Sequence, residues 1–173
     1  DRLLTLLVWL HRQILTSPHV AQCTARFAVL QGLLELLGPT VAQTPSATRS
    51  VLHLLLQVAA QHPSLRQAAL TKVKQTCEQV LQWKPQAMAV NVKFVCSGLL
   101  LLFSPTVGRG HCPADRSPSG PVDAGSTNVL ILDILRLVVL QASDQYPELE
   151  PSLRTLDPFP LDAAFKDFTA RLQ

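Results

Sequence analysis

The helix pair that decides the fold lies in residues 45–83, PSATRSVLHLLLQVAAQHPSLRQAALTKVKQTCEQVLQW. Each half begins at a proline, Pro45 or Pro63, and then carries apolar residues at intervals of three or four positions. Proline suits the first turn of a helix, because the amide hydrogen that it lacks has no partner there. The spacing predicts one apolar face per helix, so we expect amphipathic helices over 45–61 and 63–83.

The same pattern extends over the rest of the chain. It predicts further helices over residues 2–16, 18–37, 85–103, 127–143 and 160–172. Gly38 followed by Pro39 is expected to end the helix that begins at residue 18, since proline cannot continue it. No stretch alternates strictly between apolar and polar residues, so the sequence predicts an all-α fold without strands.

The predicted helices form pairs with a regular period. The first helices of the pairs begin near residues 2, 45 and 85, and the second helices near 18, 63 and 127. When the glycine- and proline-rich residues 104–126 are set aside, the pairs recur every ~40–45 residues, close to the period of HEAT and armadillo arrays. We therefore expect a single helical-repeat domain, 1–173, with a flexible insert at 104–126.

The start of the helix at 63–83 resembles the second helix of a HEAT repeat. That family carries Val-Arg-x-Ala-Ala-Leu at this place. The matching residues are Leu65, Arg66, Ala68, Ala69 and Leu70. His62 stands where the family has an aspartate in the preceding turn, and only this repeat matches residue by residue. The resemblance implies a HEAT-like α-solenoid segment of about three helix pairs plus a terminal capping helix, which binds other macromolecules and performs no chemistry.

Composition and charge narrow the class of protein. Of the 173 residues, 47% are hydrophobic and 16% are charged, which excludes a globally disordered chain. The apolar runs at 86–103 and 129–140 contain charged residues and fall short of the ~20 apolar residues of a membrane span, so none is expected. The net charge of +3 is small. Lys72 and Lys74 fall on opposite flanks of the apolar stripe, so we expect both to be solvated and not to form one basic patch. Nucleic acid is therefore an unlikely partner. A nucleic-acid-associated helical array is kept as an alternative function.

The cysteines indicate the compartment. Their spacing, at Cys23, Cys77, Cys96 and Cys112, matches no metal-binding motif. We expect the first three to be buried free thiols and Cys112 to be accessible, as in an intracellular protein of the nucleus or cytoplasm. The alternative is a secreted four-helix cytokine-like bundle with two disulfides.

Motifs for catalysis are missing from the sequence. It contains no nucleophile elbow, phosphate-binding glycine loop or His-Glu-x-x-His motif. His53 lies on a polar stripe with Arg49 and Gln57 and is expected to face solvent. We therefore assign no catalytic, cofactor-binding or metal-binding residue and expect no enzyme.

The remaining interpretation is a non-catalytic protein–protein interaction scaffold, a segment of a larger intracellular assembly or regulatory protein. Trp9 lies in the middle of the polar side of helix 2–16, where it either packs on a preceding repeat, covers Arg12, or contacts a partner. The candidate partner-binding residues are Trp9, Arg12, Gln22, Arg26, Gln67, Lys74 and Glu78.

Ser104 and Ser117, each followed by proline, are candidate phosphorylation sites. The last helix is expected to dock by a single face, as a cap, through Leu161, Phe165, Phe168 and Leu172.

Overall fold

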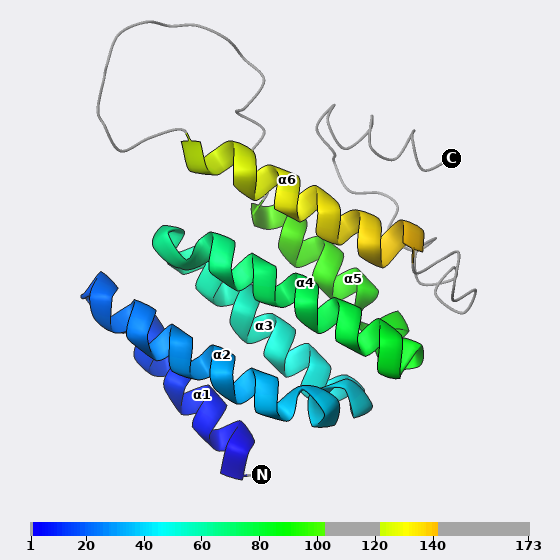
Figure 1. Cartoon of the computed structure of the whole chain (residues 1–173), viewed down its shortest axis with the longest axis horizontal. Coiled ribbons are helices and arrows are strands. Elements are labelled where there is room, and N and C mark those ends of the chain that lie inside the picture. Colours follow the sequence, from blue (N-terminus) through cyan, green and yellow to red (C-terminus); the bar gives the residue numbers. More distant parts are fainter. Residues whose placement is uncertain (1, 103–121, 142–173) are drawn as a thin grey trace, which may run out of the picture.

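The computed structural model describes residues 2–102 and 122–141, and every regular element in these ranges is helical (Figure 1). In chain order the elements are α1 (Arg2–Leu15), α2 (Val20–Gln43), α3 (Pro45–Gln61), the 3-10 turn η1 (Pro63–Leu65), α4 (Arg66–Trp83), α5 (Pro85–Leu102), α6 (Val122–Arg136) and the π-helical turn η3 (Leu137–Gln141). The all-α prediction is confirmed for this part of the chain.

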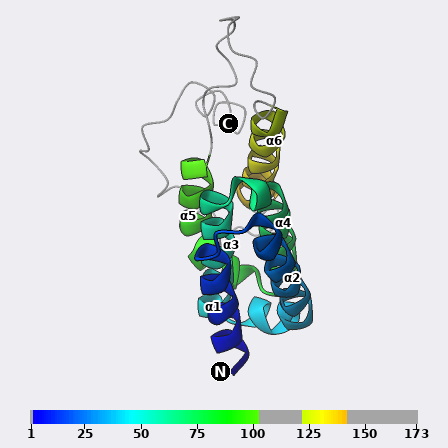
Figure 2. The same ribbon diagram turned by 90° about the vertical axis from the view of Figure 1, so that its left-hand side faces the viewer.

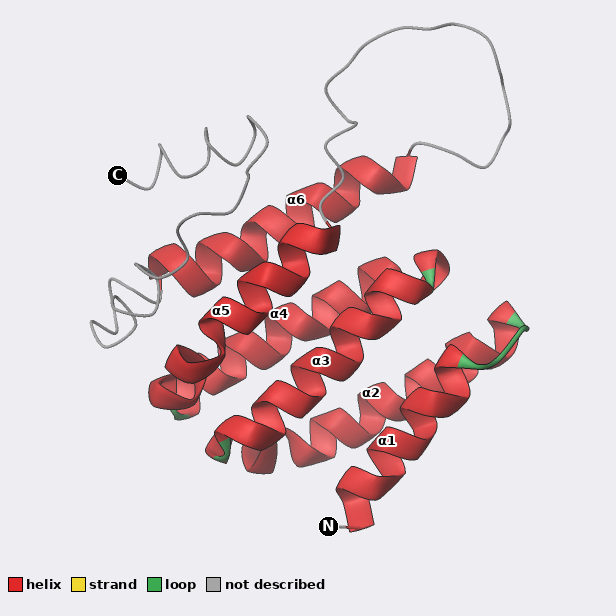
Figure 3. Ribbon diagram, turned by 180° about the vertical axis from the view of Figure 1, so that it is seen from behind, coloured by secondary structure: helices red, strands yellow, loops and turns green. Residues whose placement is uncertain are grey.

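The α-helices of the described residues lie in two layers. One layer contains α1, α3 and α5, and the other contains α2, α4 and α6 (Figure 2). Within the layers, α3 packs between α1 and α5, and α4 packs between α2 and α6, as the view from behind also shows (Figure 3). Between the layers, α1 packs on α2 and α3 on α4, whereas α5 and α6 touch only lightly.

The core fills the space between the two layers with aliphatic side chains. Burying one leucine or isoleucine contributes about 1.5–3 kcal/mol before the entropy of ordering it is subtracted. The largest fully buried side chains are those of Leu7, Ile14, Leu30, Leu52, Leu55, Leu70, Met88, Leu99, Ile131, Ile134 and Leu135. They come from all six α-helices, so one continuous core holds the described helices together.

Gly38 and Pro39 do not end the second helix, and that prediction is wrong. Helix α2 continues through Pro39 to Gln43. A proline inside a helix costs about 3 kcal/mol, because it removes one backbone hydrogen bond and crowds the preceding turn. The last turn of α2 is nevertheless held in place, since Val41 and Ala42 are buried and the Thr48 hydroxyl donates to the Val41 carbonyl oxygen at 2.8 Å.

The sixth helix begins five residues earlier than predicted. It starts at Val122 instead of residue 127, and its helical course is described as far as Gln141, the last residue of η3; residues 142 and 143 lie outside the described part of the chain. Thr127 and Asn128 are buried inside the helix and do not form its start. The stretch between α5 and α6 is therefore 103–121, shorter than the predicted insert.

Lys72 is buried, which contradicts the prediction of a solvated flank. Its side chain is 8% exposed, and its Nζ lies 3.0 Å from Oε1 of Glu35 on α2, which is 69% exposed. An ammonium group can enter a packed interface only when a counter-charge replaces its water. The long apolar stem of lysine packs between α2 and α4 while the charged end reaches the carboxylate at the rim. Lys74 is half-buried.

The described cysteines are buried free thiols, as predicted. They are Cys23 on α2, Cys77 on α4 and Cys96 on α5. The Cys23 thiol donates to the carbonyl oxygens of Ile14 and Ser17, which ties the start of α2 to the end of α1. Burial raises the pKa of Cys96 to about 12. Burial, followed by the effects of Cys96 and Glu78, also raises the pKa of Cys77. The thiols of Cys77 and Cys96 are therefore protonated and chemically inert in the folded chain.

Candidate functional site: a pocket between the first and third helices

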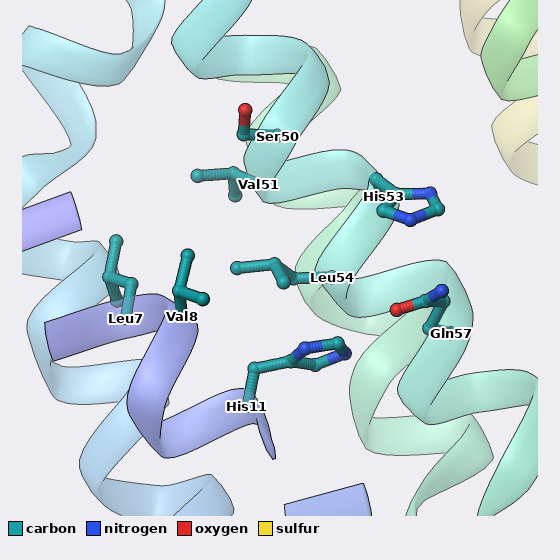
Figure 4. Close-up of a pocket in the computed structure, with 8 residues that line it drawn as sticks. All are labelled: Leu7, Val8, His11, Ser50, Val51, His53, Leu54 and Gln57. Carbon is teal, nitrogen blue, oxygen red and sulfur yellow. The ribbon is translucent and has the colours of Figure 1, made fainter. Parts of the chain in front are cut away.

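A pocket of about 330 Å³ opens to solvent between α1 and α3 (Figure 4). Its apolar lining comes from both helices and consists of Leu7, Val8, Val51 and Leu54. Its polar lining consists of His11, Ser50, His53 and Gln57. Mostly apolar walls with a few polar groups are typical of binding pockets, and this volume lies at the small end of their range.

His11 is the polar residue that sets this pocket apart. Its side chain projects from α1 toward α3, into the space between Leu54 and Gln57 (Figure 4). The residue is only 7% exposed, and its Nε2 atom has no hydrogen-bond partner. A buried polar atom without a partner costs about 1–3 kcal/mol. Burial, followed by the effect of nearby His53, lowers the pKa of His11, so the imidazole is neutral at neutral pH.

His53 connects the pocket to the neighbouring helix α5. It is exposed, as the sequence predicts, and its ring centre lies 5.8 Å from that of Phe94. The Arg49 guanidinium covers the same Phe94 ring, with its central carbon 5.2 Å from the ring centre. A cation over an aromatic face is attracted by about 0.5–1 kcal/mol at an exposed site. These contacts hold the α3 side of the pocket against α5.

The hydroxyl of Ser50 is already used by the helix. It donates to the carbonyl oxygen of Ser46 at 3.0 Å, so its proton is not directed toward an imidazole. Within the described ranges, no three His, Cys, Asp or Glu side chains gather closely enough to hold a metal ion. The pocket therefore offers a mostly apolar cavity beside a buried imidazole nitrogen that has no hydrogen-bond partner, an arrangement suited to binding.

The sequence-predicted partner residues are divided between the two layers. Trp9, 56% exposed, and Arg12, also exposed, lie on α1 next to the pocket but do not line it. The other candidates lie on the second layer: Gln22 and Arg26 on α2, and Gln67, Lys74 and Glu78 on α4. The structure does not bring these two groups together into one site.

Two arginines of the second layer, Arg26 and Arg66, each donate a hydrogen bond to the preceding helix. Arg26 is half-buried, and its Nη1 donates to the Gln13 carbonyl oxygen at 2.7 Å, which fastens α2 to α1. Arg66, from the HEAT-like stretch, is also half-buried and donates from Nε to the Ala59 carbonyl oxygen at 2.8 Å. Ala59 lies in the last turn of α3, where carbonyl oxygens lack helical donors, so Arg66 caps that helix.

Sequence reasoning missed His11, although the sequence holds a signal for it. His11 follows Leu7 by four residues and precedes Ile14 by three, and this spacing places it on the buried face of α1. Cys112, Ser104, Ser117 and the predicted helix 160–172 lie outside the described residues, so these predictions stay predictions.

Two described helices, α2 and α5, are long and apolar enough to cross a membrane by length and hydropathy alone. Their most apolar 18-residue windows have mean hydropathies of 1.2 and 1.4. Core helices of soluble proteins meet the same criterion, and both helices bury one face in the common core, so this is a weak indication.

The comparisons with known proteins add no relative. No family model matches the chain, and neither a curated protein nor a solved structure matches it. The function must therefore be inferred from the residues and their arrangement.

Proposed function

We propose that the chain is a non-catalytic protein-binding scaffold, a HEAT-like helical-repeat segment of a larger intracellular assembly or regulatory protein. Support comes from the order of the helices, since consecutive helix pairs lie side by side and contribute their first helices to one layer and their second helices to the other. Arrays of this kind share a continuous core between neighbouring pairs and leave extended faces for partners.

The observation that carries this proposal is the apolar pocket between α1 and α3, the first helices of two consecutive pairs. Its rim residue Val8 is 57% exposed, and Trp9 follows it on α1 with 56% exposed. Tryptophan and large apolar side chains beside a pocket are typical of protein-binding sites. The buried free thiols support a reducing compartment, and on this ground the proposal includes a nuclear or cytoplasmic location.

A capture experiment with matched variants tests the proposal. The tagged full chain, Val8→Glu and Val29→Glu would each be incubated with cell extract, and the retained proteins would be quantified by mass spectrometry. Val29 is a suitable control because it is 55% exposed, like Val8, but lies on α2 and does not line the pocket. We expect at least one other protein to be retained by the wild type and by Val29→Glu and lost with Val8→Glu.

Other results of this capture would argue against the scaffold. Retention that disappears after nuclease treatment would favour the nucleic-acid-associated array. A set of retained proteins that is identical for all three chains would contradict a binding role for the pocket face. Two disulfides in protein purified from an oxidising compartment would favour the cytokine-like bundle.

A further inference from the structure

The α1/α3 pocket lacks one specific group. His11 Nε2 is buried between Leu54 and Gln57 without a hydrogen-bond partner, so an occupant that reaches it regains the hydrogen bond. A hydroxyl group both donates and accepts, so it can pair with this nitrogen in either neutral tautomer of the ring. The volume of about 330 Å³ leaves room for an aromatic side chain. Tyrosine combines an apolar ring with a terminal hydroxyl and meets these conditions.

The helices of the layer that contains the pocket carry basic and no acidic residues, so this layer favours an occupant with carboxylates. Helices α1, α3 and α5 contain no aspartate or glutamate. They carry three exposed basic residues, Arg12, Arg49 and Lys93, of which Arg12 and Arg49 directly adjoin pocket residues in sequence. The other layer mixes both signs of charge. An occupant with acidic residues around its tyrosine is therefore complementary to this layer alone.

The chain itself contains a segment of this chemistry. Residues 143–150, SDQYPELE, hold its only tyrosine, Tyr146, together with three carboxylates and no basic residue. We call residues 143–150 the acidic tyrosine segment. Its composition meets the two requirements of the pocket, a ring hydroxyl and surrounding negative charge.

The geometry of the stack favours a second copy over the same chain as the source of this segment. Tyr146 follows Gln141, the end of η3, by five residues, which extend over at most about 17 Å. The pocket lies at the α1 end of the stack and α6 at the other, and α6 ends on the opposite side from the C-terminal half of α1 (Figures 1 and 3). The segment of the same chain would therefore have to run along the stack, across the layers and back along the helix axes, whereas a second copy can present it to the pocket directly.

We propose that the acidic tyrosine segment of one copy of this chain docks into the α1/α3 pocket of a second copy, with the Tyr146 hydroxyl hydrogen-bonded to His11 Nε2. The docked carboxylates face the basic residues of α1, α3 and α5. The chain then associates with itself through a short peptide and a pocket. This inference uses the same pocket as the proposed scaffold function, but the two are tested by different measurements, self-association here and capture of other proteins there.

Sedimentation of the full chain tests this association. We expect the wild type to form larger species as its concentration rises from micromolar to millimolar, and we expect Tyr146→Ala to stay monomeric. Ser50→Phe, which fills the pocket from its rim, should also stay monomeric, whereas Ser46→Phe should associate as the wild type does. Ser46 and Ser50 are both exposed on α3, but only Ser50 lines the pocket.

A peptide titration tests the hydrogen bond. A synthetic peptide of residues 143–150 would be titrated calorimetrically into the Tyr146→Ala chain, whose pockets hold no competing tyrosine. Replacing the peptide's tyrosine by phenylalanine should weaken binding about three- to tenfold, the usual worth of one hydrogen bond. Binding should also weaken as salt is raised, because the carboxylates act through screened charges.

Each of several results would overturn the proposal. These are a wild type that stays monomeric throughout, equal binding of the tyrosine and phenylalanine peptides, and equal loss of association in Ser46→Phe and Ser50→Phe. If Ser50→Phe fails to fold by circular dichroism, Gln57→Glu replaces it, since a carboxylate in the pocket repels the acidic segment. Gln61→Glu, exposed on α3 and outside the pocket lining, is the matched control and should associate normally.

Discussion

Alanine substitutions at Gly32 and Gly98 test how closely the helices approach one another. Both glycines lie inside helices, where replacing glycine by alanine gains about 1 kcal/mol of helix propensity. At Gly32 the added Cβ would meet no atom within 4 Å, so the gain should be realised in full or nearly so. At Gly98 the added Cβ would lie 2.7 Å from Cδ1 of Leu56 on α3.

The distance at Gly98 sets the expected magnitude. Two carbon atoms in contact prefer ~3.5–4.0 Å, so the added methyl falls about 1 Å short. Leu56 is only 6% exposed and has little room to move. Overpacking of this kind costs about 1–3 kcal/mol, which cancels or outweighs the propensity gain. We expect Gly32→Ala to raise the free energy of unfolding by about 0.5–1 kcal/mol and Gly98→Ala to leave it unchanged or lower it by up to about 2 kcal/mol.

Denaturant unfolding followed by circular dichroism measures both values, provided that the slope with denaturant is the same for all variants. A control is available in the Leu56→Ala background, where the obstructing methyl group is absent. There Gly98→Ala should become stabilising, and the double-mutant cycle should show coupling between the two sites. Equal stabilisation by Gly32→Ala and Gly98→Ala in the wild-type background would refute the close approach of α5 to α3.

Further predictions concern the Lys72–Glu35 ion pair, α1, the pocket histidine and the thiols. Glu35→Gln should lower the free energy of unfolding by about 1–2 kcal/mol in denaturant titrations, because Lys72 then keeps a buried charge; Lys72→Met should change it by less than about 1 kcal/mol. Trp9→Ala should cost under about 1 kcal/mol and Phe27→Ala, at a residue 2% exposed, about 3 or more; equal costs would show that Trp9 is packed. The pKa of His11 is lowered below its ordinary 6.5, so the unfolded chain binds the proton more readily and stability falls as pH drops through about 6.5; His11→Gln should show a smaller loss between pH 7.5 and 5. A thiol reagent should label the three described cysteines only after unfolding, and rapid labelling of any of them in the native chain would contradict their burial.

Local signals sufficed for most of the helices. Prolines mark the starts of α3, η1 and α5 at or near the predicted residues, because proline acts on the backbone of its own turn. The bounds of α3 agree with the prediction at both ends. These features depend on residues adjacent in sequence, which a sequence shows directly.

Features that depend on contacts between helices were predicted less well. The burial of Lys72 requires Glu35, which lies 37 residues earlier, at the same helix–helix interface. The continuation of α2 past Pro39 depends on packing of its last turn, and the pocket depends on the distance between α1 and α3. A helical wheel places a residue on a face, but it does not tell which neighbour that face meets or how close the neighbour lies.

The position of the pocket follows from unequal spacing within one layer. Gly98 lets the backbone of α5 approach Leu56 on α3, and these two helices pack extensively. Helix α1 contains no glycine, and its Val8 and His11 side chains line the space between α1 and α3. Helix α1 therefore contacts α3 less extensively than α5 does, and the gap between α1 and α3 remains open. Helix α3 takes part in both contacts. It packs closely on α5 and loosely on α1, because these two neighbours present different side chains to it. If this account is right, Gly98→Ala perturbs the α3–α5 contact while the α1/α3 pocket keeps its ability to bind the acidic tyrosine segment.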